Sequence, residues 1–168
     1  MTDLLDMIDW SCVECLNQNP SHSLNNALKQ GYREDENLFL ESDTDEQLLI
    51  HIPFNQAVRL SSWAIKSSGS KPHAPRKVKL FINRPSLGFS EAADFPAAQE
   101  FELSEADLEG NLLQLKLVKF NNVNKLSIFI EDNQGEEDVT RIQKLVLYGS
   151  GGQTMNMNEI KKVGEEQG

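Results

Sequence analysis

The feature that most constrains this fold is an alternation of apolar and other side chains, with a period of two residues, through the middle of the chain. Side chains of a β-strand point in turn to opposite faces of a sheet, so this period predicts strands. Turn sequences such as Asn121-Asn122 and Gly149-Ser150-Gly151 separate at least six such segments. Their alternating residues are Leu48, Ile50, Ile52 and Phe54; Val58, Leu60, Ser62 and Ala64, with Trp63 and Ile65 on the opposite face; Val78, Leu80 and Ile82; Leu113, Leu115 and Leu117; Leu126, Ile128 and Ile130; and Leu145 and Leu147.

An all-β sandwich follows from this pattern, because a long helical period is missing and half-buried sheets must then cover each other's apolar faces. Leu, Ile, Val and Phe make up more than a quarter of the 168 residues, which is enough for a core without disulfides or a structural metal. Short helical turns are predicted at Leu24–Leu28 and at Ser104–Asp107, where the serine and the aspartate can cap one turn.

Composition divides the chain into three parts. Residues 1–36 contain few strand formers, and we expect an irregular N-terminal arm with one or two helical turns packed on the domain. Residues 37–152 hold the alternating segments and form the β-sandwich core. Residues 153–168 are polar apart from four apolar side chains, and we expect this C-terminal tail to be partly disordered.

The charges are unevenly distributed. A net charge of −10, from 16 basic and 26 acidic residues, argues against a nucleic-acid partner, because affinity for phosphates comes from Lys and Arg. No Asp or Glu occurs from Gln47 to Ser90, whereas Glu34–Glu46 and Glu131–Asp138 are acidic runs. Such polarity is typical of oriented docking on a charged partner. The alternative is that neighbouring strands of the fold pair across the two signs.

Targeting and membrane-spanning signals are missing from the sequence. Asp3, Asp6 and Asp9 interrupt the opening, where a secretory signal needs a basic start and an apolar stretch. The longest apolar run, Leu145–Tyr148, is far shorter than the ~20 residues that cross a bilayer. With two cysteines only, we expect a reduced, cytoplasmic chain, with the nucleus as the alternative, and no membrane partner.

The sequence Cys12-Val13-Glu14-Cys15 has the spacing of a redox pair, in which one thiolate attacks a disulfide and the second resolves the intermediate. A thioredoxin-type pair follows a strand and begins a helix within a βαβ unit, and nothing before Cys12 predicts that strand. We also expect the negative charge of Glu14 to disfavour formation of a thiolate beside it. We interpret Cys12 and Cys15 as ordinary thiols, with redox catalysis as the alternative.

We expect no metal and no cofactor. Structural zinc takes four Cys or His ligands, and the three histidines are far apart in the sequence. His51 interrupts an alternating strand, and we interpret it as facing solvent. The acidic run Glu41–Glu46 has oxygen ligands that suit Ca²⁺, but it lacks the glycine and the distal glutamate of an EF-hand loop.

The segment Lys71–Lys77 is a basic loop with two prolines between two predicted strands. Proline stiffens a loop and reduces the entropy lost on binding, which favours a recognition element. A simple connection between strands is the alternative interpretation.

Several separated strings, in the right order, resemble one family. They are Glu14–Asn17, Leu40–Ile50, Lys79–Asn83, Val118–Val123, Ile128–Ile130, Asn133–Glu137, Thr140–Ile142 and Met157–Glu159. Together they resemble the PITH domain, whose name stands for proteasome-interacting thioredoxin, from about Ile8 to Val163. The resemblance implies a jelly-roll β-sandwich related to galactose-binding-like domains.

In one branch of the PITH family, the domain follows an N-terminal thioredoxin domain and attaches it to the regulatory particle of the 26S proteasome. The chain begins almost at the family's boundary and resembles a stand-alone member without the thioredoxin domain. The resemblance transfers no catalytic residue. We expect Asn83, Asn122, Asn133 and Gly135 to shape turns.

The combined prediction is a non-enzymatic, monomeric protein-interaction module that docks on a protein complex, with the 26S proteasome regulatory particle as the candidate. The predicted partner-binding residues are Glu41, Asp43, Asp45 and Glu46 on an acidic surface, and Lys71, Arg76 and Lys77 on a separate basic surface. Two alternatives stay open: a thiol-disulfide oxidoreductase that uses Cys12 and Cys15, and a small-ligand or carbohydrate-binding sandwich.

Overall fold

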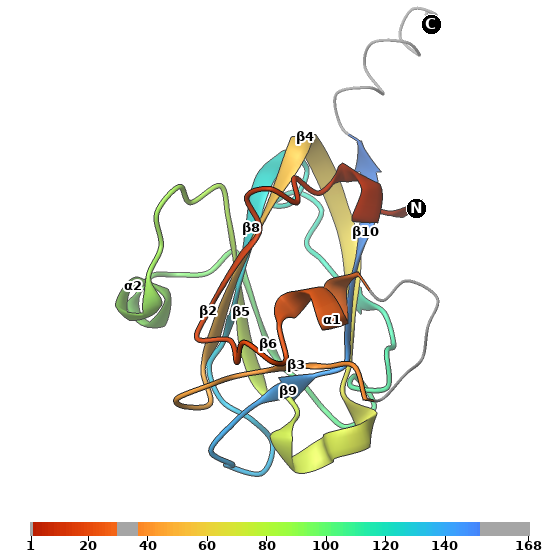
Figure 1. Cartoon of the computed structure of the whole chain (residues 1–168). Helices are drawn as coiled ribbons and strands as arrows, with labels where there is room; N and C mark the ends of the chain where they lie inside the picture. Colours follow the sequence, from red (N-terminus) through yellow and green to blue (C-terminus); the bar gives the residue numbers. More distant parts are fainter. Residues whose placement is uncertain (1, 30–36, 152–168) are drawn as a thin grey trace, which may run out of the picture.

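The computed structural model describes residues 2–29 and 37–151. Within these ranges it is built from short antiparallel strands around one long strand, with few helical turns (Figure 1). The predicted C-terminal tail, 153–168, and part of the predicted N-terminal arm lie outside the described residues. No helix within the described ranges is long and apolar enough to cross a membrane.

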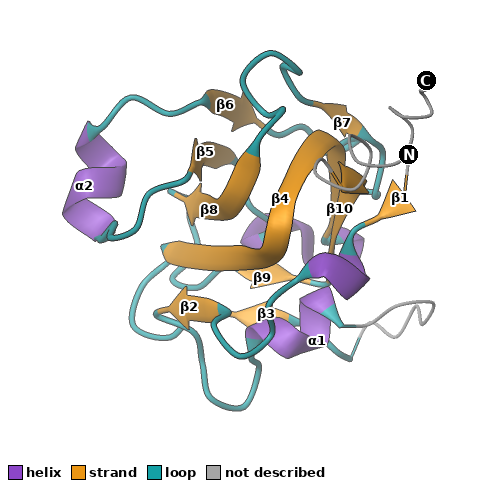
Figure 2. Ribbon diagram, turned by 90° about the horizontal axis from the view of Figure 1, so that it is seen from above, coloured by secondary structure: helices purple, strands orange, loops and turns teal. Residues whose placement is uncertain are grey.

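One bent strand connects the two layers of the sandwich. Strand β4 (Leu48–Lys66) pairs in its first half with β2 (Glu14–Leu16) and β8 (Val123–Ile130), and in its second half with β7 (Leu113–Gln114) and β10 (Lys144–Gly151). The register with β8 shifts between Pro53 and Val58, because proline cannot donate to the ladder and the chain bends there. Figure 2 shows β4 crossing from one layer to the other. The two predicted strands, 48–54 and 58–65, are therefore one continuous strand.

The remaining strands extend the two layers. On one side, β5 (Lys77–Ile82) pairs with β8, and β6 (Gln99–Glu102) pairs with β5. On the other side, β1 (Thr2–Asp3) pairs with β10. A separate two-stranded sheet joins β3 (Leu40–Glu41) to β9 (Arg141–Ile142). Every pair is antiparallel, and the prediction of an all-β sandwich is confirmed.

The core lies between the two layers and uses most of the alternating residues. Two expectations were wrong: Leu117 lies outside the strands and is exposed, and Trp63 and Ile65 share the core cluster with Leu60, because the bulge at Ser61 shifts the alternation. Ile50, Leu60, Ile128 and Leu147 are buried there together with Trp63. Burial of each such side chain is worth about 1.5–3 kcal/mol, so the two-residue alternation is the main source of stability. The core cluster also contains Leu48, Ile52, Phe54, Val58, Ile65, Val78, Leu80, Leu113, Leu115, Val123, Leu126, Ile130 and Leu145.

A bulge in β4, with Ser61 as the extra residue, lies where β4 passes closest to β10. The register shifts between Tyr148 and Gly149. A Cβ atom on Gly149 would lie 1.8 Å from the carbonyl oxygen of Arg59, so only glycine fits at this crossing.

A second, smaller cluster covers the outer face of one layer. The connection from β5 to β6 carries helix α2 (Phe89–Asp94), and it buries Leu87 and Ala92 against Leu49, Phe81 and Phe129 (Figure 1, left). Because both faces of β4 and β8 are covered here, Leu49 and Phe129 are apolar at positions where the alternation of the core residues would allow polar ones. The sequence did not indicate α2, whose N-cap is Gly88, with Glu91 three residues later.

The interpretation of His51 as solvent-facing is wrong. The residue is only 4% exposed, beneath the β5–β6 connection. Nδ1 lies 2.7 Å from Ser127 Oγ and Nε2 lies 3.2 Å from the carbonyl oxygen of Leu87. That carbonyl only accepts, so Nε2 carries the proton and Nδ1 accepts from the Ser127 hydroxyl. The histidine fastens the connection to the sheet.

The N-terminal segment is more regular than expected. Besides β1 and β2 it forms helix η1 (Leu5–Met7) and helix α1 (Leu24–Leu28), the latter at the predicted residues. Leu4 and Ile8 enter the core, and the Leu4 N–H donates to the carbonyl oxygen of Leu147 at 2.9 Å. The segment thus completes the sandwich instead of only lying on it. The predicted turn at Ser104–Asp107 is also present, with reciprocal side-chain caps.

Candidate functional site

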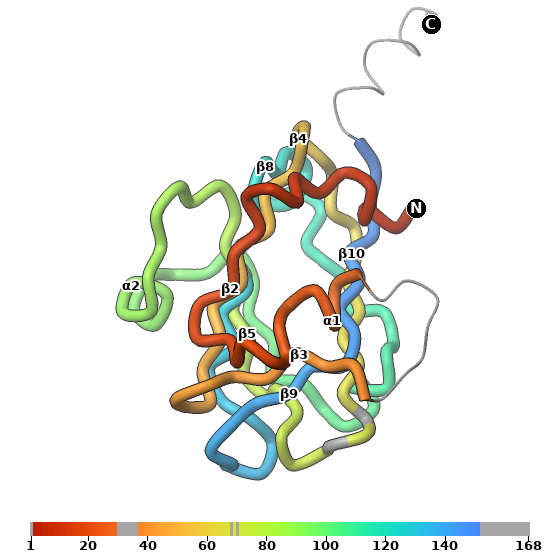
Figure 3. The backbone as a smooth tube through the Cα atoms, in the orientation of Figure 1, coloured from red at the N-terminus to blue at the C-terminus, as the bar shows by residue number. Residues whose placement is uncertain are grey.

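Three loops meet at one end of the sandwich (Figure 3). They are the β3–β4 loop (residues 42–47), the β4–β5 connection with helix η2 (Ser68–His73), and the β8–β9 loop (residues 131–140). The Ser42 N–H donates to the Thr140 carbonyl at 2.9 Å, and the Gly135 N–H donates to the Pro72 carbonyl at 2.8 Å. We call this region the loop end.

Asn133 and Thr140 fix the β8–β9 loop. Asn133 is buried; its Oδ1 accepts from the Glu137 N–H at 2.7 Å, and its Nδ2 donates to the carbonyl oxygens of Glu137 and Val139 at 3.1 Å. Thr140 donates its N–H to Ser42 Oγ at 2.8 Å and its hydroxyl to the Glu46 carbonyl at 2.7 Å. Two acidic segments almost 90 residues apart are therefore held in one arrangement. The prediction that Asn133 shapes a turn is confirmed.

Asn17 organises the β3–β4 loop from a third segment. Its Oδ1 accepts from the N–H and the hydroxyl of Thr44 at 3.1 and 2.9 Å. Its Nδ2 donates to Asp45 Oδ1 at 2.8 Å and to the Gln47 carbonyl at 2.7 Å. Its φ of 71° lies in the left-handed region, which asparagine tolerates better than most residues. Sequence reasoning missed this residue as part of the site, although Asn17 is the last residue of Glu14–Asn17, one of the segments that resemble the PITH family.

The tied loops enclose an open cleft of about 390 Å³. Six carboxylate side chains line it with Thr44 and Asn133, and we call it the acidic cleft. The six are Asp45, Glu46, Asp132, Glu136, Glu137 and Asp138. Asp43 is exposed in the same β3–β4 loop. The structure thus brings the predicted residues 43–46 together with the second acidic run, 131–138. Within the described residues, no group of three or more His, Cys, Asp or Glu side chains could hold a metal ion.

Glu41 is not among the residues that line the acidic cleft. Its Oε2 accepts from Arg141 Nε at 2.6 Å and its Oε1 accepts from Asn19 Nδ2 at 3.3 Å. The Glu41 side chain is only 14% exposed. Of the four predicted acidic residues, Glu41 therefore joins β3 to β9, and the other three lie at or beside the acidic cleft.

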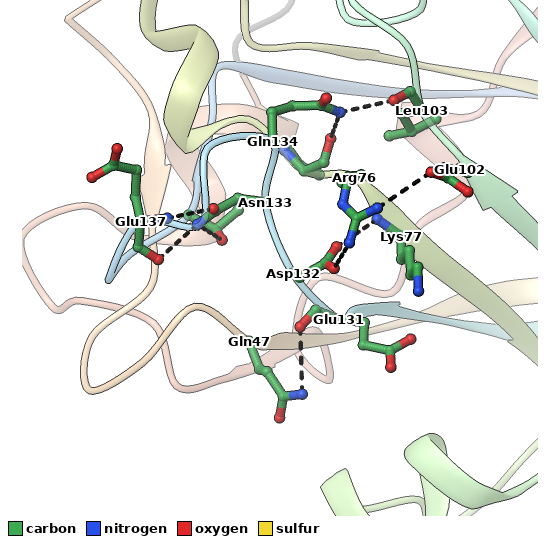
Figure 4. A network of polar contacts seen from close by, with 12 residues as sticks. Gln47, Arg76, Lys77, Glu102, Leu103, Glu131, Asp132, Asn133, Gln134 and Glu137 are labelled. Carbon is green, nitrogen blue, oxygen red and sulfur yellow. Dashed lines mark hydrogen bonds and ion pairs between the residues drawn. The ribbon is translucent and has the colours of Figure 1, made fainter.

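The predicted basic residues adjoin the acidic ones and bind to them (Figure 4). Arg76 donates to Asp132 Oδ2 at 2.6 Å and to Glu102 Oε2 at 3.3 Å. The hydrogen bond and the charge of Asp132, with a smaller effect of Glu102, raise the pKa of Arg76 above its usual value. The Lys77 N–H donates to Asp132 Oδ1 at 2.9 Å. The Arg76 charge is therefore compensated within the chain.

The lysines of this loop also lie among acids. Lys71 Nζ is 3.9 Å from Glu105 Oε1, and both side chains are exposed. Lys77 lines an open groove with three carboxylates, those of Glu100, Glu102 and Glu131. The structure thus places the basic loop beside the acidic cleft as a mixed rim, with Lys71 and Lys77 as its exposed cations.

The two cysteines lie apart from the loop end. Cys12 is exposed in a turn, and Cys15 is half-buried in β2, where it pairs with Ile50 of β4; both are free thiols. Burial, with a smaller effect of the Glu14 charge, raises the pKa of Cys15 to about 12. A thiol with such a pKa is almost fully protonated at neutral pH and is a poor nucleophile. Neither cysteine lies in a helix.

The PITH domain family matches residues 1–165 of the chain. The chain belongs to the PITH domain family. Its relatives include Thioredoxin-like protein 1 of Schizosaccharomyces pombe, 40% identical over 155 residues, and PITH domain-containing protein CG6153 of Drosophila melanogaster, 37% identical over 148 residues. These alignments cover 90% and 87% of this chain. They cover 52% and 68% of the relatives, so this PITH domain spans about half the length of the first.

Solved structures identify the fold of this PITH domain. The family 32 CBM from Clostridium perfringens NanJ, in complex with galactose, has a TM-score of 0.61 and 12% identity, and covers 87% of this chain and 97% of that one. CBM32-3 from a family 31 glycoside hydrolase of the same organism has a TM-score of 0.57 and 18% identity, and covers 86% and 96%. The prediction of a galactose-binding-like jelly roll is confirmed.

Proposed function

We propose that this PITH domain is a non-catalytic protein-interaction module that docks on a protein complex through the loop end, with the 26S proteasome regulatory particle as the candidate complex. The observation that carries the proposal is the acidic cleft. Six carboxylates from two distant segments line one open concave surface. Asn17, Asn133 and Thr140 hold its backbone by hydrogen bonds. A surface that is already ordered loses little entropy on binding.

The charge pattern defines the kind of partner. An acidic concave surface with a mixed rim attracts a basic, convex element, and Lys71 and Lys77 can contact acidic groups around it. Exposed charges of this kind mainly steer encounter and set orientation, and their effect decreases with salt. The family name, which stands for proteasome-interacting thioredoxin, gives the regulatory particle as the first complex to test.

The test is capture of purified 26S regulatory particle by the immobilised domain. The acidic variant combines D43K, E46K, E137K and D138K, which are cleft or loop carboxylates whose side chains make no hydrogen bond within the described residues. The basic variant is K71E/K77E, which leaves the Arg76 pair intact. The control variant, D6K/D94K, reverses exposed charges far from the loop end. Circular dichroism checks that every variant is folded.

We expect the acidic variant to bind at least tenfold more weakly at about 0.15 M salt, with a smaller loss for K71E/K77E and none for the control. If the acidic variant and K71E/K77E both bind as well as wild type, the loop end is not the docking surface. If the wild-type domain binds no regulatory particle at all, that complex is not its partner.

A second candidate function is carbohydrate binding, which the fold shared with family 32 CBM structures favours. Sugar sites usually need an exposed aromatic face, and the described tryptophans do not provide one. Trp63 is buried in the core, and Lys29 Nζ lies 4.6 Å above the half-buried ring of Trp10. A glycan array that gives no hit with the wild-type domain would dismiss this candidate, whereas a hit lost on mutation of the loop end would support it.

A further inference from the structure

An exposed apolar turn lies at the end of β8 opposite the loop end. Leu117 is 61% exposed and Val118 is 84% exposed. Among the described residues, the other exposed large hydrophobic side chains are Leu112 at 45% and Phe95 at 37%. Leu117 and Val118 are thus the most exposed of this group, and they are adjacent in the chain. We call residues 116–119 the apolar turn.

Hydrogen bonds and buried neighbours hold the apolar turn on the sheet. The Lys119 N–H donates to the Lys116 carbonyl at 2.8 Å, and Leu115 and Phe120 on either side are buried in the core. The Leu115 N–H donates to the Ser61 carbonyl at 3.1 Å, and the Phe120 carbonyl accepts from the Leu60 N–H at 2.9 Å. Both flanks of the turn are therefore fastened to β4, and Leu117 and Val118 cannot turn inward without loss of these contacts.

The turn carries local positive charge in an acidic protein. Lys116 and Lys119 flank the two apolar residues and are exposed, and Arg59 is exposed on the adjoining part of β4. The sequence contains no Asp or Glu between Glu109 and Glu131. The eight residues of β8 separate this turn from the acidic cleft by about 26 Å. That distance is about three Debye lengths at physiological salt, so the cleft's charge is largely screened at the turn.

The residue types favour a lipid surface over a protein pocket. Anchors of protein interfaces are enriched in Trp, Tyr and Arg, and Lys is depleted there. Here the tip is convex, with two aliphatic side chains between two lysines. Lysines beside an apolar tip can extend their ammonium groups toward lipid phosphates while the apolar groups enter the boundary between headgroups and acyl chains.

We propose, against the expectation of no membrane partner drawn from the sequence, that the apolar turn is a peripheral contact for membranes that carry anionic lipids. Leu117 and Val118 insert at the boundary, and Lys116, Lys119 and Arg59 contact the lipid phosphates. This contact is weak and reversible, because two aliphatic side chains bury little area and one such signal gives only marginal membrane affinity. The proposal does not depend on the acidic cleft, which faces away from the membrane in this orientation.

The test is co-sedimentation of the full chain with vesicles of phosphatidylcholine alone and of phosphatidylcholine with 30% phosphatidylserine (about a third anionic lipid). Two variants address the turn: L117S/V118S and K116E/K119E. Each has a matched control. L112S/F95S removes two other exposed apolar side chains, and K71E/K77E reverses two lysines at the opposite end. All four variants alter exposed residues, and urea unfolding checks their stability.

We expect wild type to bind the anionic vesicles and to bind neutral vesicles at least tenfold more weakly. L117S/V118S and K116E/K119E should bind the anionic vesicles at least tenfold more weakly than wild type, and both control variants should bind them nearly as well as wild type. Release of wild type at about 0.5 M salt is also expected. Absence of wild-type binding at millimolar anionic lipid overturns the proposal, as does binding of both turn variants at the wild-type level. If L117S/V118S instead loses only the binding to regulatory particle, the turn is a protein contact and the membrane proposal is overturned.

Discussion

Asn133 and Thr140 stand near the two ends of the acidic β8–β9 loop and are joined by a hydrogen bond of 3.2 Å from Asn133 Nδ2 to Thr140 Oγ1. The same threonine hydroxyl donates to the Glu46 carbonyl at 2.7 Å. These two hydrogen bonds therefore form a buried relay that fixes the shape of the β8–β9 loop and its distance from the β3–β4 loop. It holds in place two segments whose carboxylates repel each other.

The variant Asn133→Asp tests this relay. The change keeps the acceptor for the Glu137 N–H, but it replaces the amide donor by a carboxylate that faces three oxygen acceptors. We expect a loss of about 2–4 kcal/mol in the free energy of unfolding, measured by urea titration. Asn121→Asp, in an exposed turn, is the matched control and should stay within about 0.5 kcal/mol of wild type. Equal effects of the two changes would show that Asn133 has no special role.

Gly135 allows the β4–β5 connection to pack on the same loop. A Cβ atom there would lie 2.8 Å from Pro72 Cβ and 3.0 Å from Pro72 Cα. Gly135→Ala must therefore push the two loops apart, and we expect a loss of about 1–3 kcal/mol in urea or thermal unfolding. A Cβ atom on Gly88 would have its nearest neighbour 3.8 Å away, so Gly88→Ala meets no close contact and should cost only the N-cap preference for glycine, about 0.5–1 kcal/mol. A tolerated Gly135→Ala would contradict the close packing of the loops.

The fold could be predicted because its information is local. The alternation at Leu48–Phe54 or Leu126–Ile130 depends only on which face of a strand is buried. His51 shows where this reasoning fails. It stands at a polar position of the alternation, yet the β5–β6 connection folds over that face and buries it. Local pattern does not say which loop returns to cover a sheet.

The candidate site was predictable in part. The acidic character of residues 43–46 and 131–138 is visible in the sequence, but their union in one cleft depends on β4 and β8 pairing, which brings Leu48 opposite Ile130. The pairing of Arg76 with Asp132 has the same origin, since β5 also pairs with β8. Strand pairing thus brings together acidic and basic segments that the sequence alone places on separate surfaces.

His51 makes stability depend on pH. Burial, with a smaller effect of Lys125, lowers the pKa of His51 in the folded chain, while Glu14 opposes this shift. The unfolded chain then binds the proton more readily, so the neutral ring's contribution is complete above about pH 6.5 and is lost as pH falls through the lower folded pKa. We expect the free energy of unfolding to decrease below about pH 6.5, by at most about 1.4 kcal/mol per pH unit for this one proton.

The matched variant for this pH dependence is His51→Gln, compared with wild type by urea unfolding between pH 8 and pH 5. Glutamine cannot take up a proton, so its curve should be flatter over this range. It should also be less stable than wild type at pH 8 by about 1–3 kcal/mol, because the contacts with Ser127 and Leu87 change. Parallel curves for the two proteins would show that His51 does not titrate as proposed.

The thiol chemistry provides the last test, because it separates a docking module from an oxidoreductase. With the pKa of Cys15 raised to about 12 by burial, its thiolate fraction at pH 7.5 is about a thousandfold or more below that of an ordinary cysteine. We expect iodoacetamide to modify Cys12 of the folded chain quickly and Cys15 only after unfolding in urea, as read by mass spectrometry, with Cys12→Ser assigning the labelled site. A redox pair would instead form a reversible disulfide between the two residues and reduce insulin in the presence of a dithiol. Fast labelling of native Cys15, together with insulin reduction that is lost in Cys12→Ser, would favour the oxidoreductase and contradict a purely docking role.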